Sequence, residues 1–320
     1  MTPDVVTLGE TMVLLNPARS GPMKYLTEFR KQLGGAESNV AIGLARLDHD
    51  AGWNSALGDD PHGEYVEAFV RGEGVDVSTV RTDPDRPTGL MFKERQELGE
   101  TSVYYYRHGS AASAMTPEDL PPAYVADAEY LHLTGITPAL SASCRETVER
   151  AIELAVENDV TVSFDPNVRR KLWDSEEEMR SVLLDLIGKS DVAYPGTDEG
   201  DLLFDTADPA AIADECFALG AEAVVVTRGA DGAYVAKTDG TVAEAVPPYE
   251  TERVVDPVGA GDGFVAGFLS GRLDGLDLVA STERACAVGA FATTVSGDVE
   301  ALPGREDLAV FTGTEEAVMR

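Results

Sequence analysis

The sequence predicts an α/β protein built on a mostly parallel sheet that is covered by helices on both faces. Short runs rich in β-branched residues alternate with longer stretches that have the apolar spacing of amphipathic helices. The strand runs include 223–227 (AVVVT), whose unbroken apolar character is typical of a strand buried on both faces. No repeat or domain linker interrupts this order, so residues 1–320 are expected to form one domain.

The elements follow one another in a simple order. Residues 5–8 form the first strand, and residues 37–47 (ESNVAIGLARL) form a helix because apolar residues recur every three or four positions. Strands are then predicted at 130–133, 160–164, 192–194 and 223–227, with helices at 143–156 and 176–187. A strand that ends at Asp256 precedes two long helices, 261–273 and 278–294.

Two segments, 11–31 and 88–107, break this alternation because they have the pattern of strands joined by turns. Gly99-Glu100 is the expected centre of a hairpin in the second segment. Extra antiparallel strands of this kind often form a lid over a ligand site. An extension at the edge of the main sheet explains the pattern equally well.

The charge balance excludes several classes of partner. With 57 acidic and 25 basic residues, the formal charge is −32, which disfavours nucleic-acid and membrane-surface binding. No apolar run reaches the roughly 18 residues of a spanning helix, and the N-terminus lacks a signal-peptide pattern. A cytoplasmic protein is expected. Only 6 of the basic residues are lysine, and this composition is typical of proteins adapted to KCl-rich cytoplasm, which indicates a halophilic source.

Cysteine and histidine spacing gives no sign of a metal site. Cys144, Cys216 and Cys286 lie about 70 residues apart, so reduced and buried thiols are expected. The four histidines show no ligand spacing, and His132, inside a predicted strand, is expected to be a core residue.

The strongest functional signal is residues 254–267 (VVDPVGAGDGFVAG), where a run of small residues leads into a helix. Small residues let backbone N–H groups turn toward a ligand, and the positive end of the helix dipole favours phosphate. Asp262 lies in the first turn of this helix. Its carboxylate is either a helix cap or a general base for a hydroxyl nucleophile.

A second glycine-rich segment, residues 33–41 (LGGAESNVA), also precedes a helix and permits close approach of a small ligand. Neither segment is a P-loop or a dinucleotide fingerprint. Leu183 replaces the first glycine of the one Gly-Lys-Ser sequence, and Phe264 replaces the third glycine of the fingerprint.

These two segments resemble the N-terminal and C-terminal signatures of the ribokinase-like (PfkB) carbohydrate kinases, and the order of elements agrees along almost the whole chain. The resemblance implies a ribokinase-like fold with a small β-lid, phosphoryl transfer from ATP-Mg²⁺ to a sugar hydroxyl, and a homo-oligomer; K⁺ is a further candidate ligand. It implies that Asp262 is the catalytic base. The implied anion hole is Gly259, Ala260 and Gly261, and the implied sugar contacts are Gly34 and Gly35.

Two arginines bear on the substrate. If residues 103–107 form a strand, Tyr105 and Arg107 share a face, and Arg169 follows a strand end, where such folds bind ligands. The two guanidinium groups either hold a carboxylate or pair with surface acids. The segments GGAESNVAIGLARL, YYYRHGSAASAM, LHLTGITPAL and FDPNVRRKLW resemble the 2-keto-3-deoxygluconate kinases. This resemblance implies that substrate is bound by Tyr105, Arg107, Ile136, Arg169 and Asp298.

Two positions depart from that pattern. Met91 stands where several of these kinases carry a tyrosine, which bears on whether the galacto epimer is also accepted. In 195–199 (PGTDE) the asparagine of an Asn-x-x-Glu motif is missing, so only Glu199 is left near the magnesium, through indirect contact.

The resemblance also implies a nucleotide-binding loop made of Thr227, Arg228, Gly229 and Gly232, with Gly261 as a further nucleotide contact. The alternatives are a fructokinase or other family kinase, and a regulator that binds sugar or nucleotide without turnover.

Overall fold

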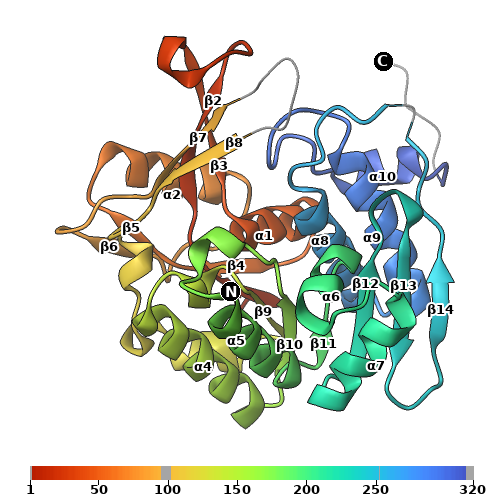
Figure 1. Ribbon diagram of the computed structural model, residues 1–320. Helices are drawn as coiled ribbons and strands as arrows, with labels where there is room; N and C mark the ends of the chain where they lie inside the picture. Colours follow the sequence, from red (N-terminus) through yellow and green to blue (C-terminus); the bar gives the residue numbers. More distant parts are fainter. Residues whose placement is uncertain (1, 95–101, 252, 315–320) are drawn as a thin grey trace.

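The computed structural model describes residues 2–94, 102–251 and 253–314, and its centre is an eight-stranded sheet (Figure 1). The strand order is β14-β13-β12-β11-β10-β9-β1-β4, parallel from β12 to β4, with β13 and β14 antiparallel. The mostly parallel sheet is therefore confirmed. The strands are β1 (Val5–Leu8), β4 (Ala51–Asn54), β9 (Tyr130–Thr134), β10 (Thr161–Asp165), β11 (Val192–Ala193), β12 (Ala223–Thr227), β13 (Ala233–Lys237) and β14 (Ala243–Val246).

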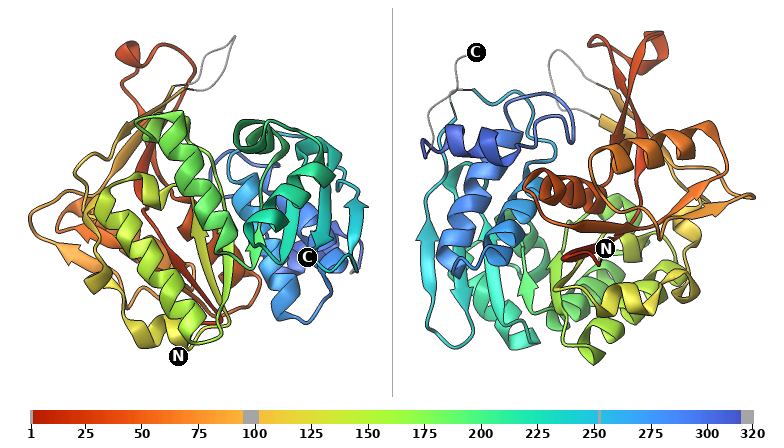
Figure 2. Two further views of the ribbon diagram at one scale, coloured as in Figure 1. Left: turned by 60° about the horizontal axis from the view of Figure 1, so that its bottom comes forward. Right: turned by 180° about the vertical axis from the view of Figure 1, so that it is seen from behind.

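Helices cover both faces of this sheet (Figures 1 and 2). The alternating side chains of β1 show the two faces, because Val6 and Leu8 belong to one apolar core and Val5 to the other. The first core lies under α3 (Pro122–Ala126), α4 (Ala142–Glu157), α5 (Glu176–Gly188), α6 (Thr197–Phe204) and α7 (Pro209–Leu219). The second lies under α1 (Ala36–Arg46), α2 (Pro61–Gly72), α8 (Ala260–Leu273) and α9 (Leu278–Ala292), with α10 (Arg305–Phe311) against α9.

Residues 12–34, 90–94 and 102–106 build a separate sheet that projects from the body (Figure 1). Its order is β3-β2-β7-β8, with β2 (Met12–Pro17), β3 (Phe29–Gly34), β7 (Leu90–Glu94) and β8 (Ser102–Tyr106). We call it the small sheet. It is not an edge extension of the main sheet, and the expected hairpin centre at 99–100 lies outside the described residues. A third, two-stranded sheet pairs β5 (Ala56–Gly58) with β6 (Arg81–Asp83).

One predicted strand is wrong. Residues 253–258 form no strand; Val254 and Val255 are 62% and 44% exposed. The N–H groups of Val255 and Asp256 both donate to the carbonyl of Thr293, at the end of α9, so no neighbouring strand uses them. The two valines have a high β propensity, but no neighbouring strand pairs with them. A strand requires such a partner as well as the propensity.

The predicted core residues are in the core. The three cysteines are free and buried. His132 is fully buried, and its ring shares a 3.0 Å hydrogen bond with Ser163; burial lowers its pKa to about 3, so it is neutral. No helix in the described ranges is both long and apolar enough to cross a membrane.

Candidate active site

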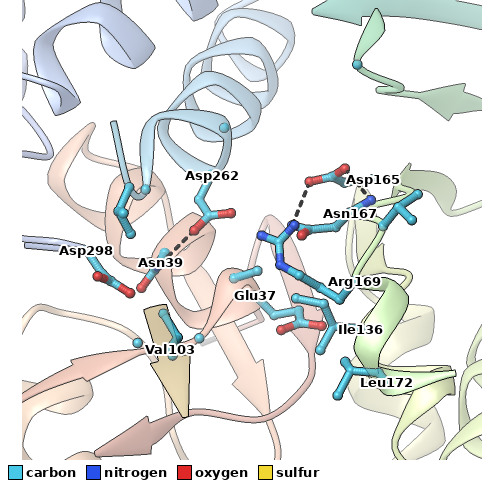
Figure 3. A pocket seen from close by; sticks show the side chains of 18 of the residues that line it. Glu37, Asn39, Val103, Ile136, Asp165, Asn167, Arg169, Leu172, Asp262 and Asp298 are labelled. Carbon is cyan, nitrogen blue, oxygen red and sulfur yellow. Dashed lines mark hydrogen bonds between the residues drawn. The ribbon is translucent and has the colours of Figure 1, made fainter. Parts of the chain in front are cut away.

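A cavity of about 840 Å³ opens at the carboxyl edge of the main sheet, where the small sheet and the N-termini of α1 and α8 meet it (Figure 3). This edge is where open α/β sheets bind ligands. Thirteen of the sequence-predicted site residues line it: Gly34, Gly35, Tyr105, Arg107, Ile136, Arg169, Glu199, Thr227, Gly229, Gly259, Gly261, Asp262 and Asp298. Ala260, Arg228 and Gly232 do not line it.

The turn before α8 requires its glycines. Gly259 has φ +80°, in the left-handed region, and a Cβ there would lie 2.3 Å from the backbone oxygen of Asp298. A Cβ at Gly261 would meet nothing within 4 Å, so its backbone faces open space. In the described part of the chain, the amides of Gly261 and Asp262 donate to no backbone acceptor outside the helix. These N–H groups and the helix dipole favour an anion at this point.

Asp262 is not the cap of α8, because Gly259 occupies the N-cap position without a side-chain bond. Its Oδ2 instead accepts a 2.7 Å hydrogen bond from Nδ2 of Asn39, in α1 (Figure 3). Burial raises the pKa of Asp262 to about 7, with the charges of Asp298 and Glu37 adding to it, while Asn39 and Arg169 act in the opposite direction. A carboxylate with this pKa can both take and release a proton near neutral pH.

The diglycine lets the small sheet approach α1. A Cβ at Gly34 would lie 2.1 Å from Cε of Met91, and one at Gly35 would lie 2.5 Å from the carbonyl oxygen of Glu10. Met91 is buried and pairs across the sheet with Tyr105. Met91, one of the two positions that depart from the resembled pattern, therefore belongs to the cavity wall as an apolar group.

Glu37 is a buried carboxylate that sequence reasoning missed. Its Oε1 accepts hydrogen bonds from the hydroxyls of Thr134 (2.7 Å) and Thr137 (2.8 Å). Burial raises the pKa of Glu37, and its Oε2 has no hydrogen-bond partner among the described residues. The signal available was the helix position, two residues after the diglycine, on the face that meets the cavity.

The two predicted arginines differ sharply. Tyr105 and Arg107 do share a face, with the guanidinium 5.8 Å from the ring centroid. Arg107 is buried and paired with the buried Glu10, whose Oε2 lies 2.5 Å from both Nε and Nη2. Ser110 donates to the other oxygen of Glu10. Arg107 therefore pairs with an acid, but a buried one rather than a surface one.

Arg169 is exposed, and no carboxylate in the described ranges lies within ion-pair distance of it. It points into the cavity beside Asp165 and Asn167, whose backbone and side-chain N–H groups both donate to Asp165 (Figure 3). Burial raises the pKa of Asp165 strongly, and the charges of Glu199 and Asp262 add to this effect. Glu199 accepts the N–H groups of Val168 at 2.6 Å and Gly196 at 2.9 Å.

The predicted nucleotide loop lies partly at the cavity. Thr227 and Gly229 line it, where β12 ends. Gly232 serves the backbone instead, because its φ is +83° and a Cβ there would lie 2.3 Å from the carbonyl oxygen of Val246. This glycine permits the turn into β13.

Lys93 is a second residue that sequence reasoning missed. It lies on β7, two positions after Met91, and both side chains reach the cavity, as strand alternation requires. Its Nζ lies 2.7 Å from Oδ1 of Asp298. Asp298 is thus in the cavity wall as predicted, but it is paired with a lysine.

The known proteins that this chain resembles include carbohydrate kinases. The model of the pfkB family carbohydrate kinases matches residues 2–305. The chain is 42% identical over 316 residues to a 2-dehydro-3-deoxygluconokinase of Bacillus subtilis (98% of this chain, 97% of the relative). It is 35% identical over 323 residues to a 2-dehydro-3-deoxygalactonokinase of Haloferax volcanii (100% of each).

Two solved structures have the same fold. A PfkB protein from Polaromonas sp. JS666 superposes with a TM-score of 0.88 at 40% identity, covering 96% of this chain and 99% of that one. A putative ribokinase II from E. coli, in complex with ATP and Mg²⁺, superposes with a TM-score of 0.89 at 25% identity, covering 98% and 100%.

Proposed function

The chain belongs to the pfkB family of carbohydrate kinases, and from this we propose that it transfers the γ-phosphoryl group of ATP to the 6-hydroxyl of 2-keto-3-deoxygluconate. This compound is the 2-dehydro-3-deoxygluconate in the name of the Bacillus subtilis relative. The observation that supports an acidic sugar most directly is the guanidinium of Arg169, which has no ion-pair partner among the described residues and faces the same cavity as Asp262 (Figure 3). The galacto epimer is a second candidate substrate, since the Haloferax volcanii relative is named for it.

The residues of the cavity can bind the sugar acid and move its proton. Arg169, with Arg107 in the wall of the same cavity, orients the substrate carboxylate through charge-assisted hydrogen bonds. Asp262 accepts the proton of the 6-hydroxyl as O6 forms its bond to the γ-phosphorus, the bond from that phosphorus to the bridging oxygen breaks, and ADP leaves. The amides of Gly261 and Asp262 and the dipole of α8 stabilise the charge on the transferring group. The small sheet, acting as a lid, excludes water.

The acidic residues at the end of β10 and in the first turn of α6 fit a nucleotide with Mg²⁺. Asp165 and Glu199 are half-buried acids whose pKa values are raised by burial, and for Asp165 also by the charge of Glu199; a bound cation would offset both effects. Both oxygens of Glu199 already accept backbone N–H groups, and no cluster of three acidic, histidine or cysteine ligands occurs in the described ranges. Asp165 and Glu199 would therefore hold Mg²⁺ through water. When bound, the ion neutralises phosphate charge.

The pH dependence follows from Asp262. Only its ionised form accepts a proton, and its pKa is raised to about 7, so kcat/KM should increase about tenfold per pH unit below 7 and level off above 8. Initial rates between pH 5 and 9 at constant ionic strength measure this, with thermal unfolding at each pH as the control for folding. An acidic limb near pH 4, the ordinary carboxyl range, would contradict the assignment.

Asn39 controls the pH below which kcat/KM declines, because it is the hydrogen-bond partner of Asp262. Asn39→Leu removes the hydrogen bond to Oδ2 of Asp262, and a hydrogen bond to a charged group contributes about 1.5–3 kcal/mol. We expect the pH at which kcat/KM declines to move up by about one to two units, and kcat/KM at pH 7 to fall about five- to fiftyfold. Asn158→Leu, which removes a side-chain bond to Leu154 in α4, is the matched control. An unshifted limb in Asn39→Leu would show that Asn39 does not act on Asp262.

We further propose a cytoplasmic, salt-adapted enzyme of one domain that assembles into a homo-oligomer. The formal charge of −32 supports salt adaptation, because the Debye length falls from about 10 Å at 0.1 M to about 3 Å at 1 M salt. The unfolding midpoint should rise steadily between 0.1 and 2 M KCl. Sucrose at matched osmolality is the control for general exclusion effects, and a midpoint insensitive to KCl would sink this part of the proposal.

Analysis of the product tests the function itself. Incubation with ATP-Mg²⁺ and 2-keto-3-deoxygluconate should give one phosphorylated product whose ³¹P signal couples to the protons of C6. A fructokinase is the second candidate, and the pairing of Arg107 with Glu10 favours it, because a neutralised arginine attracts a carboxylate less. Phosphorylation of fructose with none of the keto acid would establish that candidate instead.

A further inference from the structure

A buried ion pair joins the small sheet to the loop that follows α9. The two side chains lie only 2.7 Å apart (Nζ of Lys93 to Oδ1 of Asp298), and the residues are 3% and 8% exposed. A buried charge is costly without its partner, so each residue depends on the other for its place. The proposed reaction assigns no step to this pair.

Asp298 also touches both glycine segments of the cavity. A Cβ at Gly259 would lie 2.3 Å from the backbone oxygen of Asp298, and one at Gly34 would lie 2.5 Å from its Oδ2. Asp298 therefore fills the space between the diglycine and the turn that begins α8. A shift of Asp298 would move the wall of that turn.

The same loop has further attachments on both sides. Gln32, on β3 of the small sheet, donates a side-chain hydrogen bond to Glu300. In the other direction, the hydroxyl of Ser296 donates to Oδ2 of Asp256, 3.1 Å away, in the segment that leads to Gly259. Residues 296–300 thus connect the small sheet to the turn at the N-terminus of α8.

We propose that Lys93 is a positioning residue that couples the small sheet to the phosphate-binding turn through Asp298. This inference rests on the proposed sugar-acid kinase activity. When substrate orders the small sheet, Lys93 holds Asp298, and with it the Gly259 turn, in the arrangement that binds phosphate. Because coupling between two binding sites is reciprocal, bound nucleotide strengthens sugar binding by the same factor.

Calorimetric titration of the full chain measures this coupling. The dissociation constant of Mg²⁺ with a non-hydrolysable β,γ-imido ATP is determined with and without saturating 2-keto-3-deoxygluconate. For the wild type, the dissociation constant without sugar should be at least fivefold larger than the one with saturating sugar. Lys93→Met should reduce this ratio to less than twofold while the binary sugar affinity changes less than about threefold. Lys93→Arg, which can still pair with Asp298, should keep the wild-type ratio of dissociation constants. Lys24→Met, at an exposed lysine between β2 and β3, should not alter this ratio.

Each outcome decides the proposal. A Lys93→Met protein with the wild-type ratio would overturn it, as would a wild-type protein that turns over the sugar without any coupling. If Lys93→Met fails to fold, the double variant Lys93→Met, Asp298→Asn removes both charges and should also lose the coupling. If wild type phosphorylates no keto acid, the proposed function fails, and the coupling is measured with the sugar that it does phosphorylate.

Discussion

Replacing Asp262 by asparagine should lower kcat between about 10²- and 10⁴-fold, the usual contribution of a general base. The amide has the shape of the carboxyl group and its oxygen can still accept the bond from Asn39, but it cannot take the proton of the 6-hydroxyl. The dissociation constant of the sugar acid, measured without nucleotide, should change less than about threefold.

Two measurements separate this from a general loss of structure. The variant should unfold at the wild-type temperature or above, because removing a half-buried carboxylate whose pKa is raised relieves a desolvation cost. Asp214→Asn, at an exposed aspartate of α7, should have wild-type kcat. An Asp262→Asn protein that keeps kcat within tenfold of wild type would show that another group takes the proton.

Arg169→Ala should raise the KM for 2-keto-3-deoxygluconate about 10- to 100-fold, because a hydrogen bond to a charged group contributes about 1.5–3 kcal/mol. The KM for a neutral sugar should stay nearly constant. The free energy of unfolding should fall only slightly, since Arg169 is exposed and has no ion-pair partner in the described ranges, although its charge lowers the pKa of Asp262.

Arg169 is a cleaner test of carboxylate binding than Arg107. Arg107→Ala would leave Glu10 as a buried, unpaired acid, which costs about 3–5 kcal/mol of stability and mixes folding with binding. Arg180→Ala, at an arginine paired with Asp205 on the surface, is the matched control for loss of one positive charge. Equal KM values for wild type and Arg169→Ala would place the carboxylate elsewhere.

The features that could be predicted from sequence are local ones. The run of small residues before α8 predicts the turn there. A side chain at Gly259 would be strained at φ +80° and would also collide with the backbone of Asp298. The apolar run of β12 likewise predicts a strand buried on both faces. The failure at 254–256 has the same origin, since local preference cannot show whether a partner strand is present.

The contacts that give these residues their chemistry join distant parts of the chain. Asn39 and Asp262 are 223 positions apart, Lys93 and Asp298 are 205 apart, and Glu10 and Arg107 are 97 apart. Each pair joins the small sheet, α1 or a strand end to another element, and only the folded chain shows the pairing. For this reason the sequence could propose Arg107 and Arg169 as equivalent carboxylate ligands. The structure distinguishes them, because Arg107 is paired with Glu10 and Arg169 has no ion-pair partner in the described ranges.

The specificity of ADP formation tests the central claim most directly. Initial rates in 2 M KCl with ATP-Mg²⁺ are compared for 2-keto-3-deoxygluconate, its galacto epimer, fructose and ribose. We predict that kcat/KM for the keto acids exceeds that for fructose and ribose at least 100-fold, because only the keto acids present a carboxylate to Arg169. Equal or higher kcat/KM on fructose would contradict the account and would give the arginines of the cavity a structural role.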